Sequence, residues 1–429
     1  MSTHPTRKRE PAVTPAPHPG PAPHLGPAPH LGPASHPGEP PAPARDADAP
    51  DLTKPPVPAP DRGEPPAPDR GEPPAPDRGE PSAPVDFGRT TWAWRWAGAA
   101  LRVDRRSVLV CAALATTVLV VGVLTLGTGS ISLTPGQVVT ALLDPDSDRR
   151  ARLVVVDWRL PRLLFALFCG AALAVSGAIF QSLTKNPLGS PDIIGFSSGS
   201  YAGASVVMLL LGSANYLAVG AGSLVGGAAA ALLVYLLAYR GGLHPFRLII
   251  VGIAVGAGLS SVTSMLLLSV NPQAAMLAAT WAAGSLSGLG FTELGPAAVG
   301  FVVLLLCSVL VVRPLVQLEM GDDAAVALGV RAHRVRLSAT LVGVALTALV
   351  TAAVGPIAFV ALAAPQIAQR LTRSSTTLRI VPAALTGALV LVTADYAAQR
   401  LELPVGVVTV CVGGLYLAWL LARQYATRR

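Results

Sequence analysis

Long stretches without a charged residue dominate the second part of the chain. Residues 193–239 carry no charge over 47 positions, and residues 248–292 carry none over 45. A hydrocarbon core about 30 Å thick needs a helix of roughly 20 residues, so each stretch holds more than one helix. The sequence GSAN divides the first stretch at 212–215, and Asn271-Pro272 divides the second into a long helix and a shorter apolar one. This pattern predicts a polytopic membrane protein.

The same pattern along the whole chain predicts about ten membrane segments, of which the eighth is short. Six prolines stand where segments begin, as expected because the first helical turn has no use for the missing N–H group. The predicted segments are about 107–127, 163–184, 193–211, 216–239, 248–270, 294–312, 337–355, 360–370, 380–398 and 404–422.

The distribution of Lys and Arg sets the orientation of these segments. If the N-terminus lies inside, seventeen of the basic residues after residue 90 fall on the inner side and six on the outer side. This excess predicts a multi-pass protein of the cytoplasmic membrane with both termini in the cytoplasm. The formal net charge is +8, but since the basic residues follow the topology they do not indicate nucleic-acid binding.

The N-terminal segment, residues 1–95, has a different composition. It repeats PAPHLG from residue 21 and PAPDRGEP from residue 58, and residues 1–90 hold 27 of the 40 prolines. A segment with so little apolar surface to bury is predicted to be a disordered cytoplasmic tail, and residues 96–429 are predicted to form the membrane domain. We interpret the tail as a tether, a docking segment or a segment without a specific function. Only 13% of the residues are charged, against about a quarter in soluble domains, which argues against a one-domain soluble enzyme.

Three stretches carry motifs that hydropathy alone does not require. They are WRLPRLLFALFCGAALAVSGAIFQSLTKNPLGSPDIIGFSSGS at 158–200, LEMGDDAAVALGV at 318–330, and the region from VGPIAFVALAAPQIAQRL at 354–371 to TADYAAQRLELPVGVVTVCVGG at 393–414. Over about residues 100–425 the chain resembles the permease subunits of binding-protein-dependent ABC importers for iron–siderophore complexes and vitamin B12. Within that family, NPLGSPDIIGF, FRLIIVGI, LEMGDDAAVALGV and ELPVGVVTV are most similar to the ferric-enterobactin permeases.

The resemblance implies an all-α, type II ABC importer permease of ten helices that moves a ferric siderophore across the cytoplasmic membrane. It also implies a second permease subunit, identical or paralogous, two cytoplasmic ATPase subunits and an extracytoplasmic substrate-binding protein. The chain itself is expected to bind no cofactor or metal and to hold no catalytic residue, with ATP used by the partner subunits. The sequence has no GxxxxGKS or GxxxxGKT phosphate-binding loop, and none of its three lysines follows a glycine.

The segment between the sixth and seventh predicted spans, about residues 317–333, lies on the predicted inner side. Asp322 can cap a short helix there, and Gly329 marks the end of that helix. The resemblance implies that this is the coupling helix that engages the ATPase, and an ordinary capped loop is the alternative. The predicted coupling residues are Glu319, Gly321, Asp322, Asp323, Ala324, Leu328 and Gly329.

Arg159 and Arg162 flank the outer end of the second span. The resemblance implies that they dock acidic residues of the binding protein, an electrostatic match that governs orientation. Snorkelling to the lipid interface is the alternative. Arg400 is a third docking candidate, although the connection that holds it is shorter than is usual in the family.

Asn186, Pro187 and Leu188 follow the second span on the inner side. The resemblance, here to the vitamin B12 permease, implies that they form part of the cytoplasmic gate, and a plain Asn-Pro turn is the alternative. The family often has His where this chain has Gln366, so no titratable role is carried over to that position.

Asp395 is nearly alone within an apolar span, where an ionisable group is a functional candidate by default. Because it lies about two turns from the predicted outer end, a structural hydrogen bond is favoured over proton coupling. With so little charge at mid-membrane, an ion-coupled secondary transporter is a distant alternative to the importer, as is a membrane receptor or scaffold that works through its tail. Vitamin B12 or haem as the cargo is a nearer alternative, since the sequence does not separate one bulky cargo from another.

Overall fold

The computed structural model describes residues 91–96, 99–129, 131–144, 148–191, 195–239, 245–373 and 378–426. The chain divides into two units, Met1–Ala83 and Pro84–Arg429, and every described residue belongs to the second. The predicted tail, residues 1–95, lies almost entirely outside the described residues, so its disorder stays a prediction.

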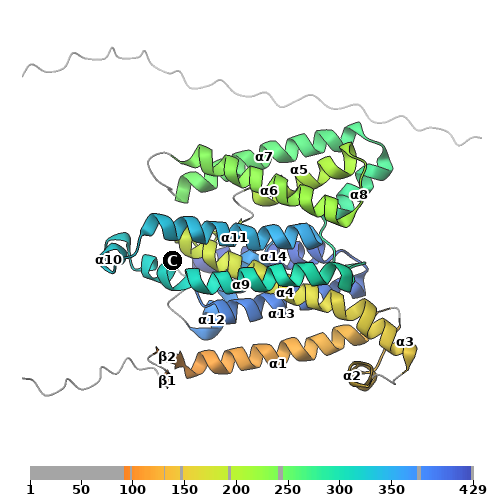
Figure 1. Ribbon diagram of the computed structural model, residues 1–429, viewed down its shortest axis with the longest axis horizontal. Coiled ribbons are helices and arrows are strands. Elements are labelled where there is room, and N and C mark those ends of the chain that lie inside the picture. Colours follow the sequence, from red (N-terminus) through yellow and green to blue (C-terminus); the bar gives the residue numbers. More distant parts are fainter. Residues whose placement is uncertain are drawn as a thin grey trace, which may run out of the picture. The chain divides into compact units, whose positions relative to one another are not determined.

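The described chain is nearly all helical, and a helix stands at each of the ten predicted membrane segments (Figure 1). These helices are α1 Arg105–Gly127, α4 Leu160–Thr184, α5 Phe196–Ser205, α6 Tyr216–Ala238, α7 Pro245–Ser269, α9 Phe291–Glu319, α11 Ala332–Val354, α12 Val360–Thr372, α13 Ile380–Leu401 and α14 Val405–Ala426. Among the described residues, seven helical stretches are long and apolar enough to cross a membrane, and Phe196–Leu210 and Val405–Trp419 are shorter apolar helices. The predicted helical membrane fold is confirmed.

Shorter elements lie between these helices. They are α2 Pro135–Leu143, α3 Arg149–Arg152, the π-helices η1 Leu153–Arg159 and η3 Val206–Leu210, α8 Pro272–Ala282 and α10 Asp322–Ala327. The short apolar helix predicted after Asn271-Pro272 is α8, and the Asn271 side chain caps it by accepting a hydrogen bond from the Ala274 N–H at 2.8 Å. Before α1, strands β1 Thr91–Trp96 and β2 Ala99–Asp104 form an antiparallel hairpin that the sequence pattern did not predict.

The second membrane segment is longer than its charge-free length suggests. α3, η1 and α4 form one helical stretch, Arg149–Thr184, of 36 residues, whereas the charge pattern predicts only 163–184. Counting uncharged positions fails here because the charged side chains of the extension have polar surroundings. Asp157 is exposed to solvent, and Arg159 and Arg162 both donate hydrogen bonds within the chain.

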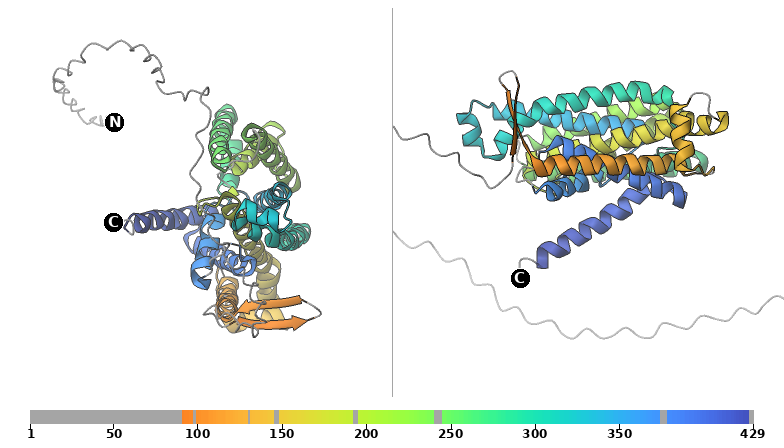
Figure 2. Two further views of the ribbon diagram at one scale, coloured as in Figure 1. Left: turned by 90° about the vertical axis from the view of Figure 1, so that its left-hand side faces the viewer. Right: turned by 90° about the horizontal axis from the view of Figure 1, so that it is seen from below.

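The centre of the bundle is α4, which packs against α9, α11, α12 and α13. In an apolar 18-residue part of its helical stretch 78% of the residues are buried, against 17% in the corresponding parts of α1 and α7. A Cβ atom on Gly170 would lie 2.4 Å from the carbonyl oxygen of Gly387 in α13, and one on Gly177 would lie 1.7 Å from that of Ala361 in α12. These glycines let the helix backbones meet, as small residues do in lipid, and Figure 2 (left) shows the resulting bundle in a view along most of its helices.

The two ends of the bundle carry different polar residues. One is named here the arginine end, where α4 begins and α1 and α13 end. The other is named the α10 end, where α4 and α9 end and α10 lies. In Figure 1, α3 and α8 mark the arginine end on the right and α10 marks the α10 end on the left. A hydrogen bond of 2.9 Å from Arg106 Nε to the Leu371 carbonyl joins the start of α1 to the end of α12 at the α10 end.

Candidate functional site

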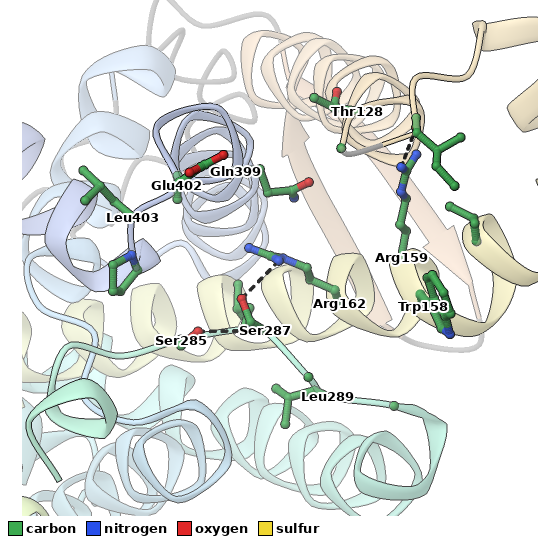
Figure 3. A pocket seen from close by; sticks show the side chains of 18 of the residues that line it. Thr128, Trp158, Arg159, Arg162, Ser285, Ser287, Leu289, Gln399, Glu402 and Leu403 are labelled. Atoms are coloured by element: carbon green, nitrogen blue, oxygen red, sulfur yellow. Dashed lines mark hydrogen bonds between the residues drawn. The ribbon is translucent and has the colours of Figure 1, made fainter. Parts of the chain in front are cut away.

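A cavity of about 740 Å³ opens at the arginine end (Figure 3). Its walls come from the loop after α1, from η1 and the first turn of α4, from the segment before α9, and from the end of α13 with the loop that follows. Arg159 and Arg162 both line it, together with the acidic side chains of Asp157 and Glu402. Trp158 also lines it and is 62% exposed. Charged groups beside an exposed aromatic side chain are typical of a protein-docking surface.

Arg162 is held by a buried carboxylate in the wall of this cavity. Its Nη2 donates to Asp395 Oδ1 at 2.8 Å, and its Nε donates to both carboxylate oxygens at 3.1 Å. Asp395 is fully buried and also accepts a bond of 2.8 Å from Gln399 Nε2, while Arg162 Nη1 donates to Ser287 Oγ at 3.2 Å. A buried charge needs a hydrogen-bonded partner of opposite sign, so the predicted structural hydrogen bond of Asp395 is confirmed.

Arg159 is tied to the loop that follows α1. Its Nη1 donates to the Leu126 carbonyl at 2.7 Å, and its Nη2 donates to the Ile131 carbonyl at 2.6 Å. Carbonyl groups in the last turn of a helix have no partner within the helix, and Arg159 supplies one for the end of α1. Arg159 therefore fixes the loop that forms one wall of the cavity.

Arg400 lies apart from the other two arginines. It is exposed and does not line the cavity. Its guanidinium carbon lies 5.6 Å from the ring centroid of Tyr396, and its Nη2 lies 3.4 Å from the Tyr396 hydroxyl. The structure thus brings Arg159 and Arg162 together and leaves Arg400 on an exposed face of α13, and the docking role of all three stays a prediction.

The sequence did not identify Gln399, Ser287 or Glu402 as parts of this end. A signal existed for Gln399, because it follows Asp395 by four positions and such pairs share one face of a helix. Ser287 and Glu402 lie in connections between helices, where no periodic pattern indicates which side chains meet.

At the α10 end, the predicted coupling residues surround the short helix α10. Asp322 was expected to cap this helix, and that expectation is wrong, since Gly321 occupies the N-cap position with φ 117° and Asp322 is the first helical residue. The Asp322 carboxylate instead accepts two hydrogen bonds, of 2.7 and 2.8 Å, from Arg336 Nη2 on α11. Gly329 follows the helix with φ 80°, as its predicted role at the helix end requires.

Most side chains of this segment face outward. Asp323 and Ala324 are exposed, and Leu328 is 61% exposed despite being apolar. Glu319, at the end of α9, differs because its Oε1 is buried without a hydrogen-bond partner among the described residues. The segment presents apolar and acidic groups together, an arrangement typical of a helix that docks in a partner's groove.

The predicted gate residues form a turn that α12 holds in place. Asn186 Oδ1 accepts a hydrogen bond of 2.9 Å from the Leu188 N–H, and Gln366 Nε2 of α12 donates to the Pro187 carbonyl at 2.6 Å. Asn186 and Leu188 also line a cavity of about 490 Å³ with residues of α5 and α7, including Ser198. The turn is therefore placed between α12 and a cavity at the α10 end.

With this geometry established, known proteins supply a comparison. Residues 117–423 match the FecCD transport family. The chain belongs to this family. The ferric enterobactin transport system permease protein FepG of Escherichia coli K12 is 47% identical over 326 residues, which make up 75% of this chain and 98% of FepG. The Fe(3+)-citrate import system permease protein YfmE of Bacillus subtilis 168 is 32% identical over 324 residues, 75% of this chain and 96% of YfmE.

A solved structure supports the same assignment at the level of the fold. It shows a metal-chelate type ABC transporter in an inward-facing conformation, with a TM-score of 0.63 and 26% sequence identity over 73% of this chain and 99% of that one. The FecCD match contains every predicted site residue, while the tail and the hairpin lie before it. The resemblance inferred from the three motif regions is confirmed.

Proposed function

We propose that this chain is the permease subunit of a binding-protein-dependent ABC importer for a ferric siderophore of the enterobactin or catecholate kind. The observation that carries the proposal is the 47% identity to a ferric enterobactin permease over 98% of that protein. Another relative, 35% identical, is the achromobactin transport system permease protein CbrC of Dickeya dadantii 3937. Relatives named for iron citrate and achromobactin favour iron chelates over vitamin B12 or haem.

In this proposal the protein lies in the cytoplasmic membrane with its arginine end outward and both termini in the cytoplasm. It pairs with a second permease subunit, and two cytoplasmic ATPase subunits bind at the α10 end. The chain binds no cofactor itself, because ATP is hydrolysed on the partner subunits. Their closure moves α10, and the path between the two permease subunits opens to alternate sides of the membrane.

The coupling role of the α10 segment is supported by its exposure and by its attachment to a membrane helix. Exposed Asp323 and Leu328 are available to a partner, while the Asp322–Arg336 ion pair connects α10 to α11. A push on α10 is therefore transmitted to a helix that packs against α4.

Docking of the binding protein is assigned to the cavity at the arginine end. Arg159 and Arg162 line it, and Arg400 offers an exposed cation next in the chain to Gln399, which also lines the cavity. Because both guanidinium groups already donate hydrogen bonds within the chain, Arg159 and Arg162 chiefly position the surface, whereas Arg400 contacts the partner directly. Such charges govern the rate and orientation of association more than the final affinity.

The gate role of Asn186, Pro187 and Leu188 is supported by their place beside a cavity and by the hydrogen bond from α12 to the turn. Gln366 is neutral, so its bond to the Pro187 carbonyl is independent of pH, and movement of α12 would carry the turn with it. In this proposal the motion of α12 opens the transport path, and the protonation of Gln366 does not change.

The experiment that tests the proposal is uptake by cells from which the gene for this chain is deleted. Ferric catecholate, ferric citrate, ferric hydroxamate, haem and vitamin B12 are supplied in turn, each with a radioactive label. We expect loss of ferric catecholate uptake alone, restored when the gene is returned. Loss of vitamin B12 or haem uptake with normal ferric siderophore uptake would show that another cargo is carried.

A further inference from the structure

A second large cavity lies on the side of the bundle, at the α10 end and away from the sites described above. Its volume is about 770 Å³, and it is lined by residues of α1, α9 and the first turns of α13. α1 lies along the edge of the bundle, as Figure 1 and Figure 2 (left) show. The cavity is called here the α1 groove.

The walls of the α1 groove are almost entirely apolar. Val108 and Ala112 come from α1, Val309 and Val312 from α9, and Leu385 from α13. Val108 is 44% exposed and Val309 is 55% exposed. In a membrane protein such a groove is filled by hydrocarbon, because water cannot solvate its walls favourably.

Two arginines, Arg313 of α9 and Arg379 at the start of α13, line the same groove. Arg379 Nη1 donates a hydrogen bond to Ser107 Oγ of α1, which directs its guanidinium toward that helix. Among the described residues the two ion pairs join other side chains, so neither arginine has a carboxylate partner there. An arginine carries five donor N–H groups, and the bond to Ser107 leaves most of those of Arg379 available.

An apolar groove with two cations and no acid at one end matches one kind of molecule. An acyl chain fits the apolar wall, and a phosphate group meets the planar donors of the two guanidinium groups, which bind phosphate through paired hydrogen bonds. Basic pockets between membrane helices bind anionic lipid headgroups for this reason. A soluble anion would leave the apolar wall empty, and a zwitterionic lipid would place its own cation against the arginines.

We propose that the α1 groove is a binding site for an anionic phospholipid, with the phosphate between Arg313 and Arg379 and one acyl chain between α1, α9 and α13. The site is separate from the α10 helix and from the gate turn. It requires that the protein spans a membrane and does not depend on the identity of the transported cargo.

The test is native mass spectrometry of the purified full-length protein with phosphatidylglycerol and, separately, phosphatidylcholine of the same chain length. We expect phosphatidylglycerol to be retained preferentially. The double variant Arg313→Gln with Arg379→Gln removes both arginine contacts to the headgroup. We expect it to weaken the retention of phosphatidylglycerol by about tenfold or more. The matched control is Arg331→Gln with Arg334→Gln, which removes two exposed arginines at the same end and should leave the preference unchanged.

A second variant tests the apolar wall without changing charge. Ala112→Phe fills the groove from the exposed face of α1 and should lower phosphatidylglycerol retention, while circular dichroism shows an unchanged helix content. Equal retention of the two lipids by the wild-type protein would overturn the proposal. So would an unaltered preference in the Arg313 and Arg379 double variant, or displacement of the lipid by inorganic phosphate alone.

Discussion

The two ends of the bundle arrange their charged residues in opposite ways. At the arginine end, Arg162 and Asp395 form an ion pair in which the carboxylate side chain is 1% exposed. At the α10 end, the Arg336–Asp322 pair has side chains 32% and 51% exposed. Loss of one partner of a buried pair is strongly destabilising, while an exposed pair contributes little to stability. The arginine end is therefore built as a fixed frame, and the α10 end presents groups that remain available to a partner.

The largest effect on the stability of the protein is expected from Arg162→Ala at the arginine end. It leaves the Asp395 carboxylate buried without its cation, and removing one partner of a buried pair costs about 3–5 kcal/mol. We expect a large fall in the thermal unfolding temperature of the detergent-solubilised protein, measured by intrinsic fluorescence, with little mature protein in the membrane.

The control for this prediction removes both charges. Arg162→Leu with Asp395→Leu replaces the pair by apolar side chains, which is often close to neutral when packing is maintained. The double variant should be more stable than Arg162→Ala. If Arg162→Ala unfolds at the wild-type temperature, the pair is not part of the frame.

The next effect, on transport with folding preserved, is expected from reversing Asp322 and Asp323 to Lys. Because both side chains are exposed, stability should change by about 1 kcal/mol or less. Uptake of the ferric siderophore should nevertheless fall to background, since α10 no longer fits its ATPase partner, while ATP hydrolysis by the complex continues.

Arg336→Gln serves as the matched variant, because it removes the ion pair on α11 and leaves both carboxylates in place. It should keep most of the uptake, because residues 328–331 still join α10 directly to α11 when the ion pair is lost. Wild-type uptake in the Asp322 and Asp323 double variant would contradict the coupling role of the α10 segment.

A smaller effect is expected at the gate turn from Gln366→Ala. The bond to the Pro187 carbonyl is worth about 0.5–1.5 kcal/mol, so its loss should raise the opening of the turn about two- to tenfold. The measurement is the rate at which a polar thiol reagent modifies a cysteine introduced by Leu188→Cys, with and without Gln366→Ala. Identical rates would mean that α12 does not hold the turn closed.

The smallest effect among the site residues is expected from Arg400→Gln. An exposed cation that contacts a partner contributes about 0.2–1 kcal/mol, so binding of the substrate-binding protein should weaken at most about fivefold. The loss should shrink as salt is raised, because exposed charges are screened. Surface plasmon resonance at low and high salt measures both quantities, and a loss independent of salt would show that the contact is not electrostatic.

The N-terminal tail lies before the residues that match the FecCD family, so its removal tests a region that neither end of the bundle includes. Deleting residues 1–88 should leave uptake within about twofold of the wild type, because a segment of this composition buries little surface. A loss of uptake at normal protein levels would show that the tail has a function of its own.

The number and order of the helices could be predicted because hydrophobic length responds directly to the thickness of a membrane. The break at Asn271-Pro272 could be predicted from the local sequence, because Asn caps a helix and Pro fits its first turn. The extension from Arg149 to Arg162 was missed because solvent exposure and hydrogen-bond partners elsewhere in the fold, which the sequence does not show, decide whether a charged side chain is tolerated there.

The candidate sites were predicted as segments but not as contacts. Arg162 and Asp395 were each identified, yet their pairing joins positions 233 residues apart, and no spacing rule connects two helices so distant in sequence. The cap at α10 was assigned to Asp322 by side-chain preference, whereas Gly321, with φ 117°, takes the position in a backbone conformation that disfavours a side chain. Such outcomes depend on the tertiary packing of α4, α11 and α13.

The central claim is that this chain moves a ferric siderophore by means of a partner's ATP hydrolysis. Its most direct test is transport into proteoliposomes that contain this permease with its second permease subunit and ATPases, with binding protein and labelled ferric siderophore outside. The account predicts accumulation only when ATP and Mg²⁺ are enclosed, unaffected by agents that collapse ion gradients. Accumulation without ATP that disappears with the ion gradient would contradict it.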